Sequence, residues 1–258
     1  MKLKTTIVVL LCALMALPAV AKDKTKVIAH RGYWKTEGSA QNSIRSLELA
    51  DQIKAYGSEF DVHLTSDNVP VVHHDMDIQG LNIQKTPYAQ LKDLKLGNGE
   101  TLPTLEQYLD KAKALKNTKL IFELKVHDTP ERNREAARIV VDMINKKGLA
   151  KKTEYITFSL DAGKELIRLA PKAKVAYLNG ELSPRELKDL GFAGLDYQFN
   201  VLRQHPDWIP EAKKLGLTIN VWTVDEEAVM KEMIANGVDF ITTDEPVVLQ
   251  KLLNSRAK

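Results

Sequence analysis

The chain has 258 residues, of which 44% are hydrophobic and 28% charged, a composition typical of a globular protein with a large buried core. Its formal net charge of +3 is too small to indicate a nucleic-acid-binding protein, and it contains no arginine-rich block. The length would permit two domains, but single barrels of this size are common.

The first 21 residues have the pattern of a secretory signal peptide. Lys2 and Lys4 precede an apolar run over residues 7–20, which closes with the small-residue pattern Ala19-Val20-Ala21. A membrane anchor is the alternative, but the run is shorter than the ~20 residues of a spanning helix and contains Pro18. We therefore expect an exported protein, either periplasmic or secreted.

Cys12, the only cysteine, lies within this apolar run. The residues before it, 9–11, lack the small residue that lipoprotein processing prefers, which makes a lipid anchor the weaker alternative. Cleavage after Ala21 would remove two lysines and lower the net charge from +3 to +1. The predicted mature protein, residues 22–258, would have no cysteine, no disulfide and no stable insertion in a membrane.

From residue 26 onward, short apolar runs alternate with amphipathic stretches. Strands are predicted at residues 27–29, 59–64, 120–124, 155–158, 174–178, 192–197, 217–223 and 239–242. Helices are predicted at residues 43–56, 104–115, 130–147, 162–169, 184–190, 206–215, 226–236 and 247–253. Eight strands in about 230 residues match the ~30 residues per unit of a TIM (β/α)8 barrel.

An open doubly wound sheet is the main alternative to the barrel. It would bind its ligand at a switch point, but no glycine-rich turn of the dinucleotide type follows the first strand. Residues 68–103 do not fit a simple crossover, so we expect a small hairpin or excursion inserted after the second strand. Without an internal repeat or a linker, residues 22–258 are predicted to form a single domain.

Acidic side chains gather at the ends of the second and third predicted strands. Glu59, Asp61 and His63 alternate along one strand and would share a face, with neighbours ~6–7 Å apart. Two carboxylates so close need a cation or a proton between them, and Glu123 could add a third oxygen. The pattern predicts a hard divalent cation, whereas the simpler alternative pairs each carboxylate with a surface lysine.

Basic and imidazole side chains follow other strands. His30 and Arg31 end the first strand, and they could exchange protons and bind phosphate, or simply cap the core. Spacing alone does not decide which of His73 and His74 would face the site. Lys125 would share a face with the acidic residue two positions earlier and could hold a phosphate oxygen, unless it is merely solvated.

These motifs carry a family resemblance. The runs His30-Arg31-Gly32, Glu59-x-Asp61-Val62-x-Leu64-Thr65-x-Asp67 and Pro70-Val71-Val72-x-His74-Asp75 resemble the glycerophosphodiester phosphodiesterase family, exported bacterial type. The later runs Glu123-Leu124-Lys125, Trp222-Thr223-Val224 and Gly237–Pro246 are similar to further motifs of that family. The matches run in order from residue 30 to residue 246 and cover nearly the whole predicted mature chain.

The resemblance implies a role for each of these residues. Within a TIM barrel, Glu59, Asp61 and Glu123 would bind a divalent metal cation, Ca²⁺ or Mg²⁺. His30 and His74 would be the general acid–base pair, and Arg31 and Lys125 would bind the phosphate. The resemblance selects His74 over His73 and reduces His63 to a supporting position.

Two positions depart from the family pattern. Where the family usually has Pro-Glu-Asn-Thr, this chain has Ala40-Gln41-Asn42-Ser43, so Gln41 keeps the shape of glutamate without its charge. If this position helps to hold the metal, the affinity should be weaker; if it only braces the site, little should change. Ser43 is still predicted to cap the following helix. Asp225 stands where the family often has asparagine.

The implied activity is metal-dependent hydrolysis of glycerophosphodiesters, which are deacylated phospholipids, to glycerol 3-phosphate and an alcohol. We expect His30 to act as the base and His74 as the acid, with either water or the glycerol hydroxyl as the attacking group. The candidates for the alcohol pocket, with a cage over choline as one form of it, are Trp34, Tyr177, Tyr197 and Trp222; the equal alternative is that they are packing residues.

Two rival functions remain open. A phospholipase that acts on intact lipid would need an exposed apolar patch at the mouth, which residues 33–39 do not show. A non-catalytic barrel that binds phosphorylated ligands is suggested only by Gln41, and the retention of both histidines and of the three acidic residues argues against it.

Overall fold

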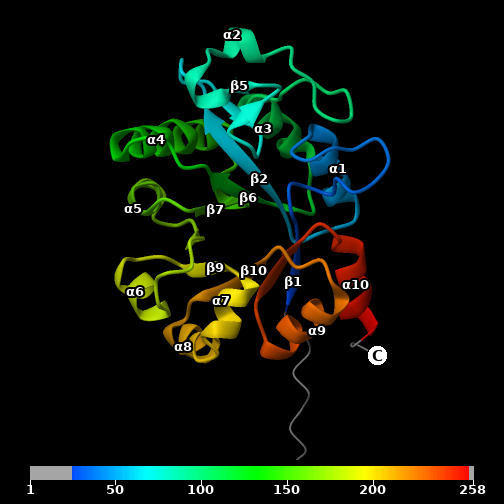
Figure 1. The fold of residues 1–258 in the computed structure, drawn as a ribbon, viewed down its shortest axis with the longest axis vertical. Helices are drawn as coiled ribbons and strands as arrows, with labels where there is room; N and C mark the ends of the chain where they lie inside the picture. Colours follow the sequence, from blue (N-terminus) through cyan, green and yellow to red (C-terminus); the bar gives the residue numbers. More distant parts are fainter. Residues whose placement is uncertain (1–24, 256–258) are drawn as a thin grey trace, which may run out of the picture.

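The computed structural model describes residues 25–255, and its main feature is a closed barrel of parallel strands (Figure 1). Its eight strands, in order around the barrel, are β1 (Lys26–Ala29), β2 (Gly57–Leu64), β6 (Lys119–Leu124), β7 (Thr153–Thr157), β8 (Val175–Tyr177), β9 (Gly194–Gln198), β10 (Thr218–Trp222) and β11 (Phe240–Thr243). Strand β1 pairs with both β2 and β11, which closes the barrel. The predicted TIM barrel is therefore confirmed. The predicted signal peptide lies outside the described residues.

The helices between the strands form the outer layer of the barrel. They are α1 (Ile44–Gln52), α3 (Leu105–Ala114), α4 (Pro130–Lys146), α5 (Leu160–Leu169), α6 (Pro184–Asp189), α7 (Phe199–Gln204), α8 (Trp208–Leu215), α9 (Glu227–Asn236) and α10 (Pro246–Ser255). Most of the core lies between these helices and the outer face of the strands, and a smaller apolar cluster that includes Ile28, Ile121 and Phe240 fills the barrel interior. Among residues 25–255, no helix is both long and apolar enough to cross a membrane.

Local signals in the sequence explain several helix boundaries. Ser43 caps α1 by accepting a hydrogen bond from the backbone N–H of Ser46, as predicted. Helix α4 begins at Pro130 behind the capping residue Thr129, and the chain leaves it at Gly148 with a φ of +74°. Ser43 and Thr129 thus end the loops that follow the carboxyl ends of β1 and β6.

Between β9 and β10, where the sequence predicts one helix at residues 206–215, the chain forms two. Helix α7 begins directly after β9, where the Gln198 side chain accepts a hydrogen bond from the backbone N–H of Asn200. Helix α8 begins only at Trp208. The sequence analysis missed α7 because its six residues are too short for the apolar period of a helix to be recognised.

The predicted insertion after the second strand is present. Strand β3 (Pro70–Val72) pairs antiparallel with β2 and is followed by the hairpin of β4 (Asp77–Ile78) and β5 (Leu81–Asn82), then by η1 (Ile83–Lys85) and α2 (Tyr88–Leu91). A second apolar cluster supports this segment; its buried members are Val71, Ile78, Ile83, Leu91, Leu96 and Leu102. The backbone N–H of His73 donates to the Asp61 carbonyl oxygen at 3.0 Å, so the insertion brings the next residue, His74, beside β2.

Candidate active site

Three buried carboxylates form the centre of the site. Glu59 and Asp61 alternate on the inner face of β2, and Asp61 lies in register with Glu123 on the neighbouring strand β6. One oxygen from each of the three side chains lies within 4.8 Å of the others. Glu59 Oε1 is buried and has no hydrogen-bond partner among the described residues. Hard oxygens at this spacing, with one oxygen unsatisfied, fit a divalent cation such as Ca²⁺ or Mg²⁺.

Burial and mutual repulsion make these carboxylates difficult to ionise together. Burial, followed by the charge of Asp61, raises the pKa of Glu59 well above its usual range and the pKa of Glu123 to about 7. For Asp61, burial also raises the pKa, but Lys125 and other positive neighbours outweigh this effect, and the net shift is downward. A bound divalent cation would relieve the repulsion among all three groups.

Two basic side chains lie beside the carboxylates. Lys125 Nζ is 2.8 Å from Glu123 Oε1 and 3.2 Å from Asp61 Oδ1. Arg31 Nε lies 4.0 Å from Asp61 Oδ2, and its Nη1 donates a hydrogen bond of 2.6 Å to Gln41 Oε1. The predicted shared face of Lys125 and Glu123 is therefore present, and Gln41 contacts Arg31.

The loop after β1 holds the first histidine in place. His30 Nδ1 is 2.7 Å from Asp244 Oδ1, and the indole N–H of Trp34 donates to the same oxygen at 3.0 Å. The backbone N–H of Arg31 donates to Glu59 Oε2 at 2.7 Å. Gly32 follows with a φ of +77°, where any Cβ would also collide with Ser46. The glycine of the His-Arg-Gly motif therefore allows this close turn.

His74 faces the same pocket from the insertion. Its Nδ1 lies 2.7 Å from Asp75 Oδ1, and burial lowers its pKa. His73 is not among the residues that line the pocket. His63 lies behind His74, with its Nε2 3.1 Å from the His74 carbonyl oxygen and its Nδ1 3.0 Å from Gln84 Nε2. The structure therefore brings His74, and not His73, to the pocket.

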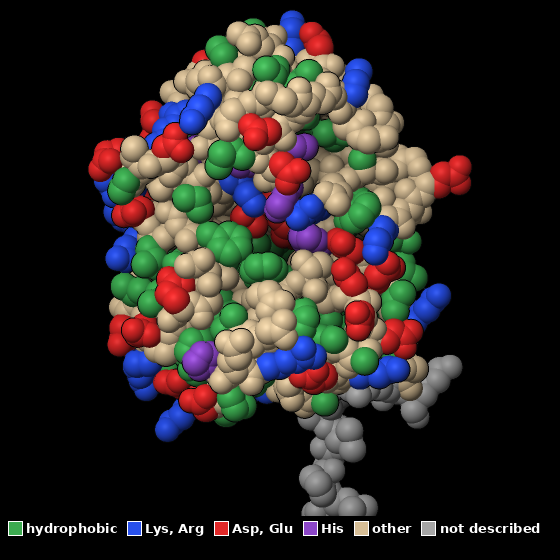
Figure 2. All heavy atoms as spheres, viewed as in Figure 1, with side chains coloured by type: hydrophobic (Ala, Val, Ile, Leu, Met, Phe, Trp, Pro, Cys, Tyr) green, Lys and Arg blue, Asp and Glu red, His purple; other side chains and the backbone are tan. Residues whose placement is uncertain are grey.

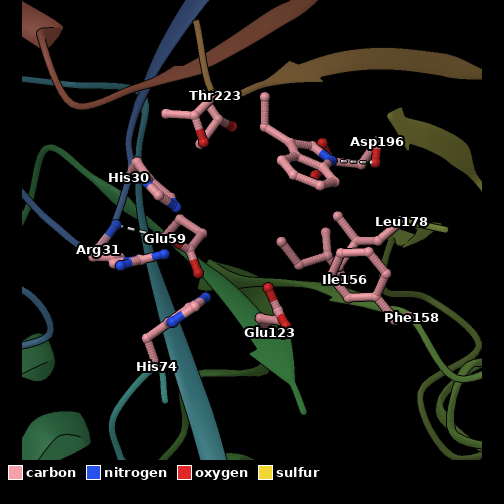
Figure 3. Close-up of a pocket in the computed structure, with 12 residues that line it drawn as sticks. His30, Arg31, Glu59, His74, Glu123, Ile156, Phe158, Leu178, Asp196 and Thr223 are labelled. Atoms are coloured by element: carbon pink, nitrogen blue, oxygen red, sulfur yellow. Dashed lines mark hydrogen bonds between the residues drawn. The ribbon is translucent and has the colours of Figure 1, made fainter. Parts of the chain in front are cut away.

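The pocket itself has a charged side and an apolar side. In Figure 3, His30, Arg31, Glu59 and His74 lie on one side, and Ile156, Phe158 and Leu178 lie on the other. On the molecular surface the pocket opens as a hollow in which histidine, acidic and basic side chains gather (Figure 2). One wall is thus suited to an anion and its counter-charges, and the other, which is apolar apart from Asp196, to a group that packs against apolar and aromatic side chains.

The four aromatic residues predicted to form an alcohol pocket have different positions. Trp222 lines the pocket, and Trp34 contacts Asp244 beside it. Tyr177 and Tyr197 belong to the buried core outside the barrel, where their hydroxyls donate to Glu181 and to the Leu182 carbonyl. Successive side chains of a strand point to opposite faces, so Tyr197, next to the inward-facing Asp196, points away from the pocket, and Tyr177 does the same on its own strand.

Sequence reasoning missed several polar residues of the site. Asn42 donates to Asp61 Oδ2 at 2.8 Å and accepts from the Asp61 backbone N–H, and Asp244 orients His30. Asp225 accepts from the Asp244 backbone N–H at 2.8 Å. Asp244 stands within the Gly237–Pro246 motif, whereas Asn42 and Asp225 stand where the chain departs from the family pattern, so the resemblance was the only available signal. Asp196, which lines the apolar side, stands in none of those motifs.

Comparison with known proteins agrees with this geometry. Residues 30–248 match the model of the glycerophosphoryl diester phosphodiesterase family. A crystal structure of a glycerophosphodiester phosphodiesterase from Parabacteroides distasonis is 69% identical, with a TM-score of 0.91, over 92% of this chain and 100% of that chain. A glycerophosphodiester phosphodiesterase from Caldanaerobacter subterraneus is 25% identical over 89% of this chain and 98% of its own length.

A further solved structure is an Oleispira antarctica phosphodiesterase in complex with the product sn-glycerol 3-phosphate. It is 25% identical to this chain, with a TM-score of 0.74, and the match covers 89% of this chain and 96% of that one. The family match spans most of the barrel, from the first histidine of the site to the last helix. The chain therefore belongs to the glycerophosphoryl diester phosphodiesterase family, whose members are phosphoric diester hydrolases.

Proposed function

We propose that this protein hydrolyses glycerophosphodiesters to glycerol 3-phosphate and an alcohol, with the help of a divalent cation. The observation that carries the proposal is the convergence of His30, His74 and the three buried carboxylates on one pocket. The Oleispira relative, whose complex contains sn-glycerol 3-phosphate, supports the same class of product for this chain.

The proposed cation would be held by Glu59, Asp61 and Glu123. When bound, it would neutralise charge on the phosphodiester and lower the barrier to nucleophilic attack. Lys125 and Arg31 lie beside the same carboxylates, so each would reach a phosphate oxygen and stabilise the charge that develops on it. Asn42 and Gln41 keep Asp61 and Arg31 in position for this task.

His30 is proposed as the general base. Its Nδ1 faces Asp244, which leaves Nε2 free to accept a proton from water or from the glycerol hydroxyl. Asp244 would stabilise the imidazolium that forms. Burial raises the pKa of Asp244, but the contact with His30 and other neighbours outweighs burial, and the net pKa lies below its usual range. This arrangement is the one expected of an oriented base.

His74 is proposed as the general acid that protonates the leaving alcohol. Burial lowers the pKa of His74 in the free protein, but a phosphodiester anion in the pocket would favour its protonated form. Asp75 accepts from the opposite ring nitrogen and holds the ring in one orientation. The charged forms of the two histidines would thus alternate during turnover.

The test is to incubate the mature protein, residues 22–258, with glycerophosphocholine and glycerophosphoethanolamine and to measure glycerol 3-phosphate. The assay is run untreated, after chelation, and after addition of Ca²⁺ or Mg²⁺. We expect release that the chelator abolishes and one ion restores. Release that persists fully after chelation would contradict the role of the cation, and no release under any condition would contradict the activity.

Hydrolysis of intact lipid is the rival function that one observation gives a reason to test. The two large hydrophobic residues that are exposed among residues 25–255 are Met76, two residues after His74, and Val126, next to Lys125. Phosphatidylcholine is offered in place of glycerophosphocholine and released choline is measured for both, because hydrolysis of the lipid yields choline and an acylated glycerol phosphate rather than glycerol 3-phosphate. We expect turnover of the deacylated substrate to exceed that of the lipid, because two side chains are far less than the contiguous patch that interfacial binding needs.

The cellular location is a separate proposal. The pattern of residues 1–21 supports export and cleavage after Ala21. Mass spectrometry of the protein from the periplasmic fraction and from the medium would test it, with Lys22 expected as the first residue. An intact N-terminus on protein from the cytosol would contradict this proposal.

A further inference from the structure

Asp196 is an acidic residue of the pocket that the proposed mechanism does not use. It lies on the inner face of β9, is only 2% exposed, and its Oδ1 has no hydrogen-bond partner among the described residues. Burial raises its pKa to about 7, and a contact with Asn220 opposes the shift only in part. A buried carboxyl oxygen without a hydrogen-bond partner is unfavourable, and a ligand group that donates to it would remove this cost.

The surroundings of Asp196 are apolar and aromatic. Trp222 is fixed against it, because the indole N–H donates to the Asp196 carbonyl oxygen at 2.8 Å (Figure 3). Phe158 meets the Trp222 ring edge to face, with ring centroids 5.7 Å apart. Ile156 and Leu178 complete this wall of the pocket. A ligand group here would meet two aromatic rings and one unpaired carboxyl.

The charge balance of the pocket shows what that group should be. With a divalent cation in place, the three negative charges of Glu59, Asp61 and Glu123 are balanced by the ion and Arg31. The negative charge of a bound phosphodiester is balanced by Lys125. His30 already has its own acidic partner. Asp196 is then the acidic residue lining the pocket that no positive charge of the described chain offsets. A cation carried by the substrate would supply the missing charge.

We propose that Asp196 selects substrates whose leaving alcohol carries a primary ammonium group, as ethanolamine does; this inference rests on the proposed function. The ammonium would donate to the unpaired Asp196 oxygen, while Trp222 and Phe158 would contact its methylene groups and its charge. A quaternary ammonium such as choline keeps the attraction to the rings but has no N–H to donate. A neutral polyol such as glycerol lacks the charge.

The experiment compares kcat/KM for glycerophosphoethanolamine, glycerophosphocholine and glycerophosphoglycerol in the wild-type protein and in Asp196→Asn, which keeps the shape of the side chain. We expect the wild type to prefer the ethanolamine substrate. The ratio of its kcat/KM to that of the glycerol substrate should fall at least tenfold in Asp196→Asn. A variant that loses activity on all three substrates by the same factor would overturn the proposal, because a purely structural role acts on every substrate alike.

Asp77→Asn is the matched control. It removes the negative charge of the exposed Asp77 side chain, three residues beyond His74 on β4, without touching the pocket lining. We expect the ratio between the substrates to stay within twofold of the wild type. An equal loss of preference in both variants would show a general field effect and would overturn a specific contact with Asp196.

A binding measurement separates this proposal from the proposed function. His74→Ala, saturated with Ca²⁺ or Mg²⁺, is titrated with glycerophosphoethanolamine and with glycerophosphoglycerol in a calorimeter. We expect at least tenfold tighter binding of the ethanolamine compound, and loss of that difference when Asp196→Asn is added. Equal affinities would overturn the proposed selection even if the wild-type protein is active. A preference in binding, together with no turnover by the wild type, would contradict only the proposed reaction.

Discussion

The two sides of the barrel mouth are built differently. On the side of β1, β2 and β6, charged residues are fixed by short polar contacts, such as Asp244 on His30 and Asn42 on Asp61. On the side of β7 to β10, the pocket is lined by Ile156, Phe158 and Trp222, and most contacts are apolar. From this difference we propose that the charged side, to which the loop after β11 also contributes Asp244, carries the chemistry and that the apolar side shapes the space for the alcohol.

Loss of either histidine should have the largest effect, because it removes proton transfer from the charged side. We expect His30→Ala and His74→Ala to lower kcat by ~10³-fold, within the usual range for general acid–base catalysis. Binding of the metal ion should be kept, because neither ring belongs to the three carboxylates. His73→Ala is the neighbouring control and should stay within threefold of the wild type. Near-normal turnover in His30→Ala or His74→Ala would contradict the assignment.

A change on the apolar side should affect binding more than chemistry. Phe158→Ala removes half of the aromatic pair but no charge from the pocket. We expect KM for glycerophosphoethanolamine to rise ~10-fold, with kcat within threefold, because contacts to the alcohol act on the ground state and the transition state alike. Steady-state kinetics measure both constants. A fall in kcat as large as that of the histidine variants would remove the distinction between the two sides.

A charged residue outside the mouth should affect stability alone. Hydrogen bonds from Arg168 and Arg138 lower the pKa of Glu165 to about 2, below the unfolded value near 4.5. The carboxylate therefore stabilises the fold fully above the unfolded value, and this contribution is lost as the pH falls towards 2. We expect Glu165→Gln to lower the free energy of unfolding by ~1–2 kcal/mol at pH 7, since both arginines are largely exposed.

The comparison of the wild type and Glu165→Gln by thermal unfolding at several pH values measures this effect. The difference in Tm should shrink as the pH is lowered from 5 to 3, while kcat at pH 7 stays within twofold. A difference in Tm that does not depend on pH would show that the ion pairs do not contribute.

The smallest effect is expected at Gln41, where the chain departs from the family pattern. Because Gln41 contacts Arg31, Gln41→Glu should turn one hydrogen bond into an ion pair. We expect kcat and the ion affinity to change by less than threefold. Gln41→Ala is the contrasting variant and should lower kcat further, because Arg31 then loses its brace. A large gain in ion affinity for Gln41→Glu would show that position 41 belongs to the metal site.

Much of the fold and of the charged side of the site could be predicted from the sequence. Apolar runs that end in Glu59, Asp61 and Glu123 indicate buried strands with polar ends, and the barrel brings those ends together. Helix boundaries at Ser43 and Pro130 followed from capping rules. The choice of His74 over His73 did not follow from spacing. It depends on how the insertion turns, which is a matter of tertiary packing.

Other features had no local signal in the sequence. Asp244 lies 214 residues from the histidine that it orients, so their contact is visible only once β1 and β11 pair. Asp196 is the one acidic residue of β9. Period-2 alternation shows that it faces the barrel interior but not that its Oδ1 lacks a hydrogen-bond partner. Helix α7 is too short for its period to be read.

The most direct test of the charged side is an ion titration of the metal-free mature protein and of Glu123→Gln, with glycerol 3-phosphate release measured in the same samples. The account predicts one Ca²⁺ or Mg²⁺ site in the wild type, at least tenfold weaker binding in Glu123→Gln, and turnover that rises with ion occupancy. Equal binding by both proteins, or full turnover by the metal-free protein, would contradict it.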